Sequence, residues 1–531
     1  MESPKRYLLV AATLLLASFG NVFAQTPAKQ LVVAVPAIPE TLDPIFTGSL
    51  MSRYMRDTLY DVVPMFETTK DAFGNTVSDV SKPPICNLCE SYSVAPDKMK
   101  WVVKFKAGIR SAAGNELTSD DAVWSFDRML KAGSPTLKGY FDTFSIDMSN
   151  PITVVDRYTW NINLTRPDFG LISVWAAPHP FGKIYDSVEI KKHAAPDDPW
   201  GNQWLKTHIA GFGPWTIDKY TPGSELRLQR NVNYHRQGIP KADSVIFKEV
   251  PSEATRASLL RAGSVDVALQ LTPRLIEPLR SVNGVKAVDI ASNQWMAWLL
   301  NSAVPPFDDV RVRQAMAYAA PIKEIIRTVY LDKPFVSRWS GYAPANFMGA
   351  PVAWPYDENL DKARALLKEA GKENFKFEIV YETNVAASEA IAIIIKSQLA
   401  KIGVEVEPKG LAPAQYSEQY RARKSQSVLF EDASWGSDGR YWLSTFFQSK
   451  GAVNHGNHKN AEFDKIVDEI TPISDLAART AMSKKAHEIL VQDVPWAFAI
   501  GTGFSLVMRD NIDGFIWRLN NWVDTRDLGK K

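Results

Sequence analysis

The side chains best suited to chemistry lie close together between Glu431 and Trp442, where the chain reads E-D-A-S-W-G-S-D-G-R-Y-W. Carboxylates in such a stretch serve as acids or bases, or hold a bound cation. Glu431 and Asp432 are poorly placed to act as a catalytic pair, because neighbours on an extended strand point to opposite faces. Asp438, beside Gly439, is of the type that caps backbone amides in a loop.

Tryptophan is frequent, with 16 among 531 residues. An indole ring stacks on the face of a sugar and also lines pockets for peptide side chains. Large aromatic side chains dominate ordinary protein interiors as well, so packing in the core is the default expectation for each one. Four are named as candidates for a ligand platform: Trp295, Trp298, Trp435 and Trp442.

The two cysteines, Cys86 and Cys89, form a C-x-x-C pair that follows Pro83-Pro84 in a predicted loop. In an oxidising compartment such a pair closes a short disulfide, which we expect here. Two alternatives stay open. A redox motif would lie at the start of a helix after a strand, and half of a zinc site would need further ligands.

Metal and enzyme signatures are weak in this sequence. His455 and His458 lie in a polar loop without nearby cysteine or acidic ligands, so we expect solvated histidines and no metal or other cofactor. No G-x-S-x-G, H-E-x-x-H or P-loop motif is present. An exported glycosidase stays open, because its carboxylate pair is set by the fold and has no fixed spacing.

With 45% hydrophobic and 23% charged residues, the chain has the composition of a globular protein. At 531 residues it is too long for a single compact domain, which indicates two or three lobes. Lys and Arg number 61 against 59 Asp and Glu, without a basic block. A nucleic-acid partner is therefore not expected.

The first 24 residues have the pattern of a signal peptide. Basic Lys5 and Arg6 precede an apolar stretch over 7–19, and Val22-Phe23-Ala24 supplies small residues for cleavage. The apolar stretch is shorter than the roughly 18 residues needed to span a bilayer. With no cysteine near the cleavage point to carry a lipid, we expect a mature protein from Gln25 that is free in the periplasm.

The predicted elements are mixed α and β. Residues 31–35 form a short apolar strand, and 101–105 alternate as a half-buried strand. Thr118 to Asp121 is a capping box before an amphipathic helix. Alternation over 375–381, helical spacing over 391–402 and renewed alternation at Val404 and Val406 predict a β-α-β unit with parallel strands.

Four segments that span nearly the whole mature chain carry a resemblance. Residues 114–123 read G-N-E-L-T-S-D-D-A-V, similar to D-G-x-P-L-T-A-x-D-V, and 211–215 read G-F-G-P-W, similar to G-T-G-P-Y. Segments 301–315 and 460–464 follow in the expected order. On these motifs the chain is identified as a member of the extracytoplasmic solute-binding proteins of family 5, the dipeptide, oligopeptide and nickel group.

The resemblance implies an α/β fold of the periplasmic-binding-protein type, class II, with two hinged lobes, mixed sheets and an extra domain. Lobe I would combine 25–68, 196–290 and 499–531. The inserted domain would cover 69–195 and lobe II 291–498. Such a receptor closes on a small-molecule ligand, acts as a monomer and delivers the ligand to the ABC permease in the cytoplasmic membrane.

The resemblance also implies a role for Asp438, because the stretch around it is similar to the family's W-x-x-D segment. In peptide-binding relatives this aspartate pairs with the ligand's α-ammonium, and Trp435 lies three positions before it. Here the chain continues G-R-Y without the usual proline, which keeps an oligosaccharide, an opine-like conjugate or a chelated metal as alternatives to a peptide. The candidate ligand-binding residues are Trp295, Trp435, Ser437, Asp438 and Trp442.

Overall fold

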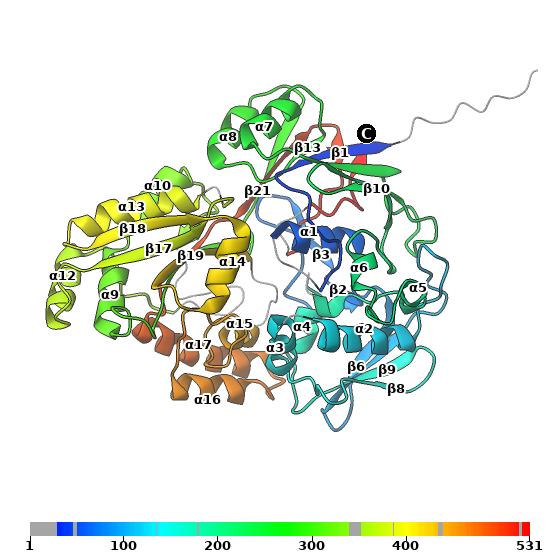
Figure 1. Cartoon of the computed structure of the whole chain (residues 1–531), viewed down its shortest axis with the longest axis horizontal. Helices are drawn as coiled ribbons and strands as arrows, with labels where there is room; N and C mark the ends of the chain where they lie inside the picture. Colours follow the sequence, from blue (N-terminus) through cyan, green and yellow to red (C-terminus); the bar gives the residue numbers. More distant parts are fainter. Residues whose placement is uncertain are drawn as a thin grey trace, which may run out of the picture.

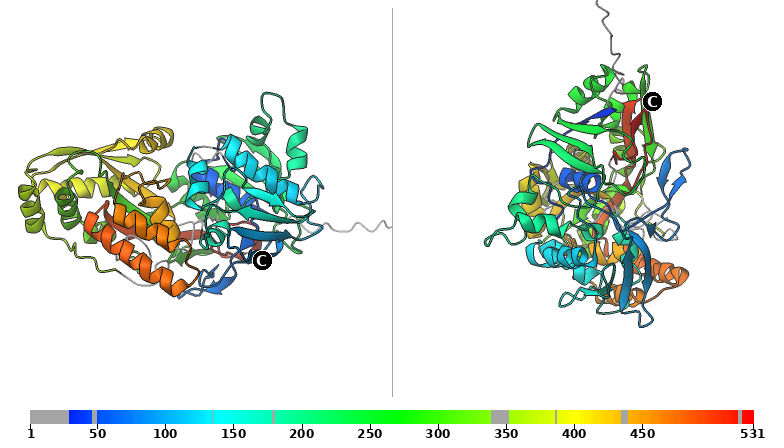
Figure 2. Two further views of the ribbon diagram at one scale, coloured as in Figure 1. Left: turned by 90° about the horizontal axis from the view of Figure 1, so that it is seen from below. Right: turned by 90° about the vertical axis from the view of Figure 1, so that its right-hand side faces the viewer.

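The computed structural model describes residues 29–45, 50–133, 135–177, 180–338, 352–385, 387–433, 439–519 and 523–531. The predicted signal peptide, Trp435, Ser437 and Asp438 lie outside these residues. Two bodies stand side by side in Figure 1 and in the left view of Figure 2. No helix in the described part of the chain has the length and apolar character to cross a membrane.

One body contains a seven-stranded sheet, here called the seven-stranded unit. Its strands, in spatial order, are β10 (Trp215–Thr221), β11 (Glu225–Arg230), β12 (Ser244–Glu249), β1 (Gln30–Val35), β13 (Val267–Ala268), β21 (Phe504–Arg509) and β14 (Val285–Ile290). Strand β1 runs parallel to β12 and β13, and the other pairs are antiparallel. The predicted strand over 31–35 is confirmed and lies buried within the sheet. Helices α1 (Leu50–Leu59), α7 (Glu253–Arg261) and α8 (Pro273–Leu279) accompany these strands.

The same body continues into a four-stranded antiparallel sheet, the four-stranded unit. Its order is β6 (Cys89–Val94), β7 (Lys100–Phe105), β9 (Thr159–Asn163) and β8 (Ile152–Val154). Trp101, Val103 and Phe105 are buried while Lys104 is exposed, as the alternation predicted. Its helices are α2 (Ser119–Ala132), α3 (Pro135–Thr143), α4 (Leu171–Trp175), η1 (Pro180–Gly182), α5 (Ser187–Lys192) and α6 (Asn202–Leu205). The capping box of α2 is confirmed, since the Thr118 backbone N–H donates to the Asp121 carboxylate over 2.9 Å.

The second body is built on a six-stranded sheet, the six-stranded unit. Its order is β16 (Ser337–Arg338), β20 (Trp496–Gly501), β15 (Gln294–Leu300), β19 (Ser427–Ala433), β17 (Lys376–Glu382) and β18 (Glu405–Leu411). The predicted β-α-β unit is confirmed as β17, α13 (Ser388–Ala400) and β18, with the two strands parallel. Residues that alternate along β15 pack into two separate cores. The sheet is therefore covered on both faces.

Helices cover the two faces of this sheet. The face with Met296 and Trp298 packs against α9 (Val310–Ala319), α10 (Ile322–Val329), α12 (Leu360–Glu369) and α13. The face with Trp295 packs against α14 (Pro413–Ala422), α15 (Gly439–Phe446), α16 (Ala461–Ile470) and α17 (Leu476–Asp493). Three further strand pairs are β2 (Pro64–Met65) with β5 (Ile85–Cys86), β3 (Thr68–Lys70) with β4 (Thr76–Ser78), and β22 (Ile512–Asp513) with β23 (Gly529–Lys530).

Candidate functional site

The two bodies meet through a buried ion pair. Arg440, at the start of α15, places Nη1 3.0 Å from Oδ2 of Asp168 in the four-stranded unit. Its Nη2 donates to the carbonyl oxygen of Thr143, at the end of α3, over 2.6 Å. Both charged side chains are almost completely buried, with exposed fractions of 1% and 0%. A charge-assisted contact without water is much stronger than the same contact at a surface.

Asp168 is held in place by more than Arg440. Its carboxylate accepts hydrogen bonds from the Gly170 backbone N–H and from the Ser145 hydroxyl, over 3.0 and 3.2 Å. Burial raises the pKa of Asp168, and the charge of Arg440 acts against that rise. Burial likewise lowers the pKa of Arg440, and the negative charge of Asp168 opposes this lowering. The pair therefore depends on both partners being present.

Further contacts surround this ion pair. The ring of Tyr441 in α15 stacks on Phe144 with ring centroids 5.6 Å apart and planes at 15°. Arg166 forms a second ion pair with Asp468 of α16 over 3.0 Å, and both of its side chains are substantially exposed. Because α15 begins at Gly439, the candidate segment 434–438 connects β19 directly to the helix that makes these contacts.

Trp295 and Trp442 come together in the structure, with ring centroids 5.2 Å apart in an edge-to-face arrangement. Trp295 also stacks on Trp496 at 5.0 Å and contacts Phe430 at 5.3 Å. Both candidate rings have no exposed surface. They form part of the core that holds α15 on the sheet, and direct contact with a ligand stays a prediction.

Trp298, another aromatic candidate, lies on the opposite face of β15. It packs against Phe377 and Phe498, and its indole N–H donates to the Ser427 hydroxyl over 2.6 Å. Its side chain has no exposed surface. The structure therefore separates Trp298 from the other two described candidates by the thickness of the sheet.

Glu431 and Asp432 lie on opposite faces of β19, as expected of strand neighbours. In the sheet register Glu431 is paired with Met296 and Asp432 with Trp295, residues that belong to the two different cores. Glu431 accepts a hydrogen bond from the Gln294 side-chain amide over 2.8 Å. Desolvation raises the pKa of Glu431 to about 7, opposed by this hydrogen bond.

A pH-dependent stability is predicted from Glu431. Its pKa in the folded protein lies above the ordinary value of 4.5, so folding favours the protonated form, and stability is lost as the pH rises through about 7. In the ligand-free protein, E431Q should raise the free energy of unfolding at pH 8 by about 1–3 kcal/mol and leave it unchanged at pH 4. Thermal melts of wild type and E431Q across this range test the sign, and an equal difference at both pH values would contradict it.

The expectation of solvated histidines is wrong. His458 is buried, with Nε2 2.9 Å from the Asp493 carboxylate and Nδ1 2.8 Å from the Phe447 carbonyl oxygen. His455 lies against the Tyr420 ring, and burial lowers its pKa to about 3. Among the described residues, no group of three or more His, Cys, Asp or Glu side chains is arranged to hold a metal ion.

Cys86 and Cys89 form a disulfide in the structure. Cys86 ends β5 and Cys89 begins β6, so the predicted loop position is corrected to a junction between two short strands. The bridge joins the small β2–β5 pair to the four-stranded unit. Neither cysteine begins a helix, which is the position that a redox pair would occupy.

The contact between the two bodies was missed from the sequence. Asp168 and Arg440 are far apart along the chain, and nothing in their local patterns shows that they meet. Arg440 had one signal, since this long cation lies two positions after Asp438, the last residue of the candidate segment, and beside two aromatic residues. Asp168 precedes Phe169-Gly170 in an ordinary loop pattern and had none.

Comparison with known proteins agrees with this architecture. The profile of the family "Bacterial extracellular solute-binding proteins, family 5 Middle" matches residues 84–454. The chain is 24% identical over 502 residues to the glutathione-binding protein GsiB of Escherichia coli (strain K12), which covers 92% of each protein.

Two solved structures are similar at 20% identity. The ABC transporter-associated periplasmic binding protein DppA from Helicobacter pylori, in complex with peptide STSA, has a TM-score of 0.82 and covers 95% of this chain and 98% of its own. The PBP AgaA in complex with agropinic acid, from A. tumefacien R10, has a TM-score of 0.81, and the match covers 94% of this chain and 99% of the AgaA chain. Likeness at this level of identity shows the fold.

Two bodies with mixed sheets, together with these structural matches, define the α/β periplasmic-binding-protein fold that the sequence predicted. The chain belongs to the bacterial extracellular solute-binding proteins of family 5. This is a family of non-enzymatic binding proteins that serve ABC importers.

Proposed function

We propose that this protein captures peptides in the periplasm by closing its two lobes and delivers them to an ABC permease. The observation that carries the proposal is the connection at α15. Segment 434–438 leads directly into a helix whose Arg440 contacts the other body through Asp168. A ligand held at this segment would therefore act on the contact that joins the two bodies, as hinge closure requires.

The peptide as ligand is supported by two observations. The Helicobacter pylori relative is solved with a peptide, and GsiB is described as a glutathione-binding protein. By the family resemblance, Asp438 matches the aspartate that pairs with the ligand's α-ammonium in peptide-binding relatives. A buried ammonium needs such a partner, because an unpaired charge taken out of water is strongly unfavourable.

The division into lobes is part of the same proposal. Strands from 30–35, 215–290 and 504–509 share the seven-stranded sheet, which supports lobe I as 25–68, 196–290 and 499–531. The six-stranded unit would be lobe II, and the four-stranded unit would belong to the inserted domain. We further propose that residues 1–24 are removed on export, which leaves a monomeric periplasmic protein.

A thermal-shift screen of the protein from Gln25 onward tests the ligand class. The ligands are di- to pentapeptides, the same peptides with a blocked N-terminus, oligosaccharides, opines and nickel–histidine. A ligand that binds only the folded state raises the melting temperature. Free peptides should raise the melting temperature more than the same peptides with a blocked N-terminus. Stabilisation by sugars, opines or nickel alone would overturn the peptide assignment and keep the receptor.

A prediction for Asp438 follows. D438N should weaken binding of a free peptide about tenfold or more, because it removes the charge that the ammonium needs, and should leave the affinity for a blocked peptide unchanged. Calorimetric titration gives both affinities. D361N is the matched control, since the Asp361 side chain is 95% exposed on α12. Equal affinity for the free peptide in the two variants would remove the ammonium anchor.

A further inference from the structure

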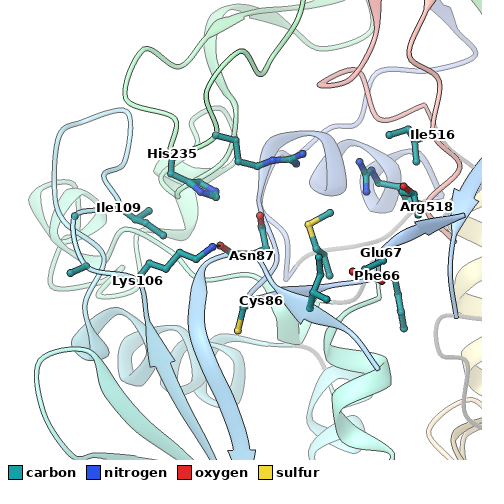
Figure 3. A pocket seen from close by; sticks show the side chains of 15 residues that line it. Phe66, Glu67, Cys86, Asn87, Lys106, Ile109, His235, Ile516 and Arg518 are labelled. Atoms are coloured by element: carbon teal, nitrogen blue, oxygen red, sulfur yellow. Dashed lines mark hydrogen bonds between the residues drawn. The ribbon is translucent and has the colours of Figure 1, made fainter. Parts of the chain in front are cut away.

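A cavity of about 870 Å³ lies away from the contact between the two bodies. Its lining residues all come from three stretches: 65–109, 235–236 and 516–518. It therefore lies where the disulfide-linked small strands, the seven-stranded unit and the C-terminal segment meet. Figure 3 shows Lys106 and His235 on one side of this cavity and Arg518 on the other.

The cavity is rich in basic side chains. Four of its lining side chains are basic, and Glu67, which is exposed, is the acidic one. The basic residues are Lys106, His235, Arg236 and Arg518.

Three of these basic side chains have partners in the protein. Arg518 pairs with Asp524 and Asp527 over 3.2 and 2.6 Å. His235 Nε2 lies 3.1 Å from the Asp61 carboxylate. Lys106 donates to the carbonyl oxygen of Asn87 over 2.9 Å and is otherwise exposed.

Arg236 differs from the other three in having neither an ion pair nor a side-chain hydrogen bond within the part of the chain that the structure describes, whereas Arg518, whose Nε also lacks a hydrogen bond, has two ion-pair partners. The Nη1 atom of Arg236 is buried and has no hydrogen-bond partner among the described residues. A buried donor on a charged group is costly to leave without an acceptor, so such groups are normally paired. The Arg236 side chain lines the cavity, so an anion there would supply the partner that its positive charge lacks, and the Arg518 guanidinium of the same lining would also favour it.

The cavity walls also carry apolar side chains. Phe66 and Ile109 are buried, and Ile516 is half-buried. The volume is in the range of sites for small organic molecules and is much larger than an inorganic ion requires. A ligand with one anionic group and an apolar body matches both parts of the lining.

We propose that this cavity is a second binding site, separate from the ligand site between the lobes, for a small organic anion. The carboxylate or phosphate of that anion is bound by Arg236 with help from Arg518. The apolar part lies against Phe66, Ile109 and Ile516. Lys106 at the exposed rim draws the anion in, and Glu67 limits the total negative charge that the site accepts.

Calorimetric titration of the mature protein with phenyl phosphate and with benzoate tests this site. Both probes carry an apolar ring, so their relative affinities show whether the site prefers phosphate or carboxylate. Inorganic phosphate should bind at least tenfold more weakly than phenyl phosphate, because it lacks the apolar body. A lack of saturable binding by either aromatic probe would overturn the proposal.

Variants connect the binding to Arg236. R236Q should lower the affinity for the tighter-binding probe at least tenfold, while R236K should lose less affinity because it keeps the positive charge. R364Q on α12 is the control, as this arginine is 48% exposed in the other body. Equal affinity in R236Q and R364Q would overturn the site. Competition between the probe and whichever ligand the thermal-shift screen identifies would overturn the separation of this cavity from the inter-lobe site, whether or not that ligand is a peptide.

Discussion

Replacement of Arg440 by methionine should weaken ligand binding by about a hundredfold. Methionine fills much of the space of the arginine stem but leaves the buried Asp168 carboxylate without its ion-pair partner Arg440, with the charge of Arg479 still acting on it. Loss of one partner from a buried pair costs about 3–5 kcal/mol. Arg440 and Asp168 lie on the two different bodies, so this cost falls on the closed arrangement, and the equilibrium between open and closed protein moves toward the open form.

Calorimetric titration with the best peptide from the screen gives the affinity, and small-angle X-ray scattering of ligand-free protein reports the opening. R166M is the control, because it removes the neighbouring ion pair with Asp468, whose side chains are 32% and 41% exposed, together with the 3.1 Å hydrogen bond from Arg166 Nε to the Ser145 hydroxyl, while the Arg440–Asp168 pair itself stays. An exposed pair contributes about 0–1 kcal/mol, so R166M should change the affinity less than about fivefold. Equal effects of R440M and R166M would contradict the role of the buried pair.

The double variant R440M/D168N separates the ion pair from simple packing. It removes the uncompensated charge, so it should bind the peptide more tightly than R440M alone. The single variant R440M should also regain affinity as the pH falls. The pKa of Asp168 is already raised by burial, and without Arg440 the carboxyl group becomes neutral at a higher pH. If the double variant bound the peptide as weakly as R440M does, steric packing would explain the loss of affinity.

Local patterns predicted many of the elements because the signals that form them are local. The β-α-β unit of β17, α13 and β18 follows from hydrophobic alternation and helical spacing within one continuous segment. The capping box before α2 needs only Thr118 and Asp121, three positions apart. The buried strand β1 needs only a run of apolar residues.

Contacts between distant segments could not be predicted in the same way. Arg440 pairs with Asp168, and His458 with Asp493, because the fold brings together segments whose charges have no fixed spacing. For His458 the polar, glycine-containing neighbourhood predicted exposure, yet the acceptors from Asp493 and Phe447 allow burial. A sequence pattern identifies such a side chain but not its partner.

The candidate site lies between these two cases. Trp295 and Trp442 were chosen for their ring chemistry, and the structure brings them together. Their complete burial is a tertiary property, since Trp496 from the distant strand β20 packs against both rings. Ring type therefore named these two residues as candidates, and the structure shows for both the core packing that was the default expectation.

Replacement of Trp295 by alanine should lower the melting temperature by about 10 °C. The ring has no exposed surface and contacts Trp442, Trp496 and Phe446. Loss of a buried tryptophan costs about 3–5 kcal/mol, and each kcal/mol shifts the melting temperature of a body of this size by roughly 2–4 °C. Differential scanning calorimetry of the ligand-free protein measures this shift.

W298A is the matched control, because Trp298 is equally buried on the opposite face of β15. Both variants should lose similar stability, but W295A should weaken peptide binding at least threefold more than W298A. Trp295 packs against Trp442 of α15, the helix that begins after the candidate segment and carries Arg440. A small displacement of that helix alters both the segment and the contact with Asp168. Equal peptide affinity in the two variants would mean that the aromatic core stabilises the six-stranded unit without positioning α15 for closure.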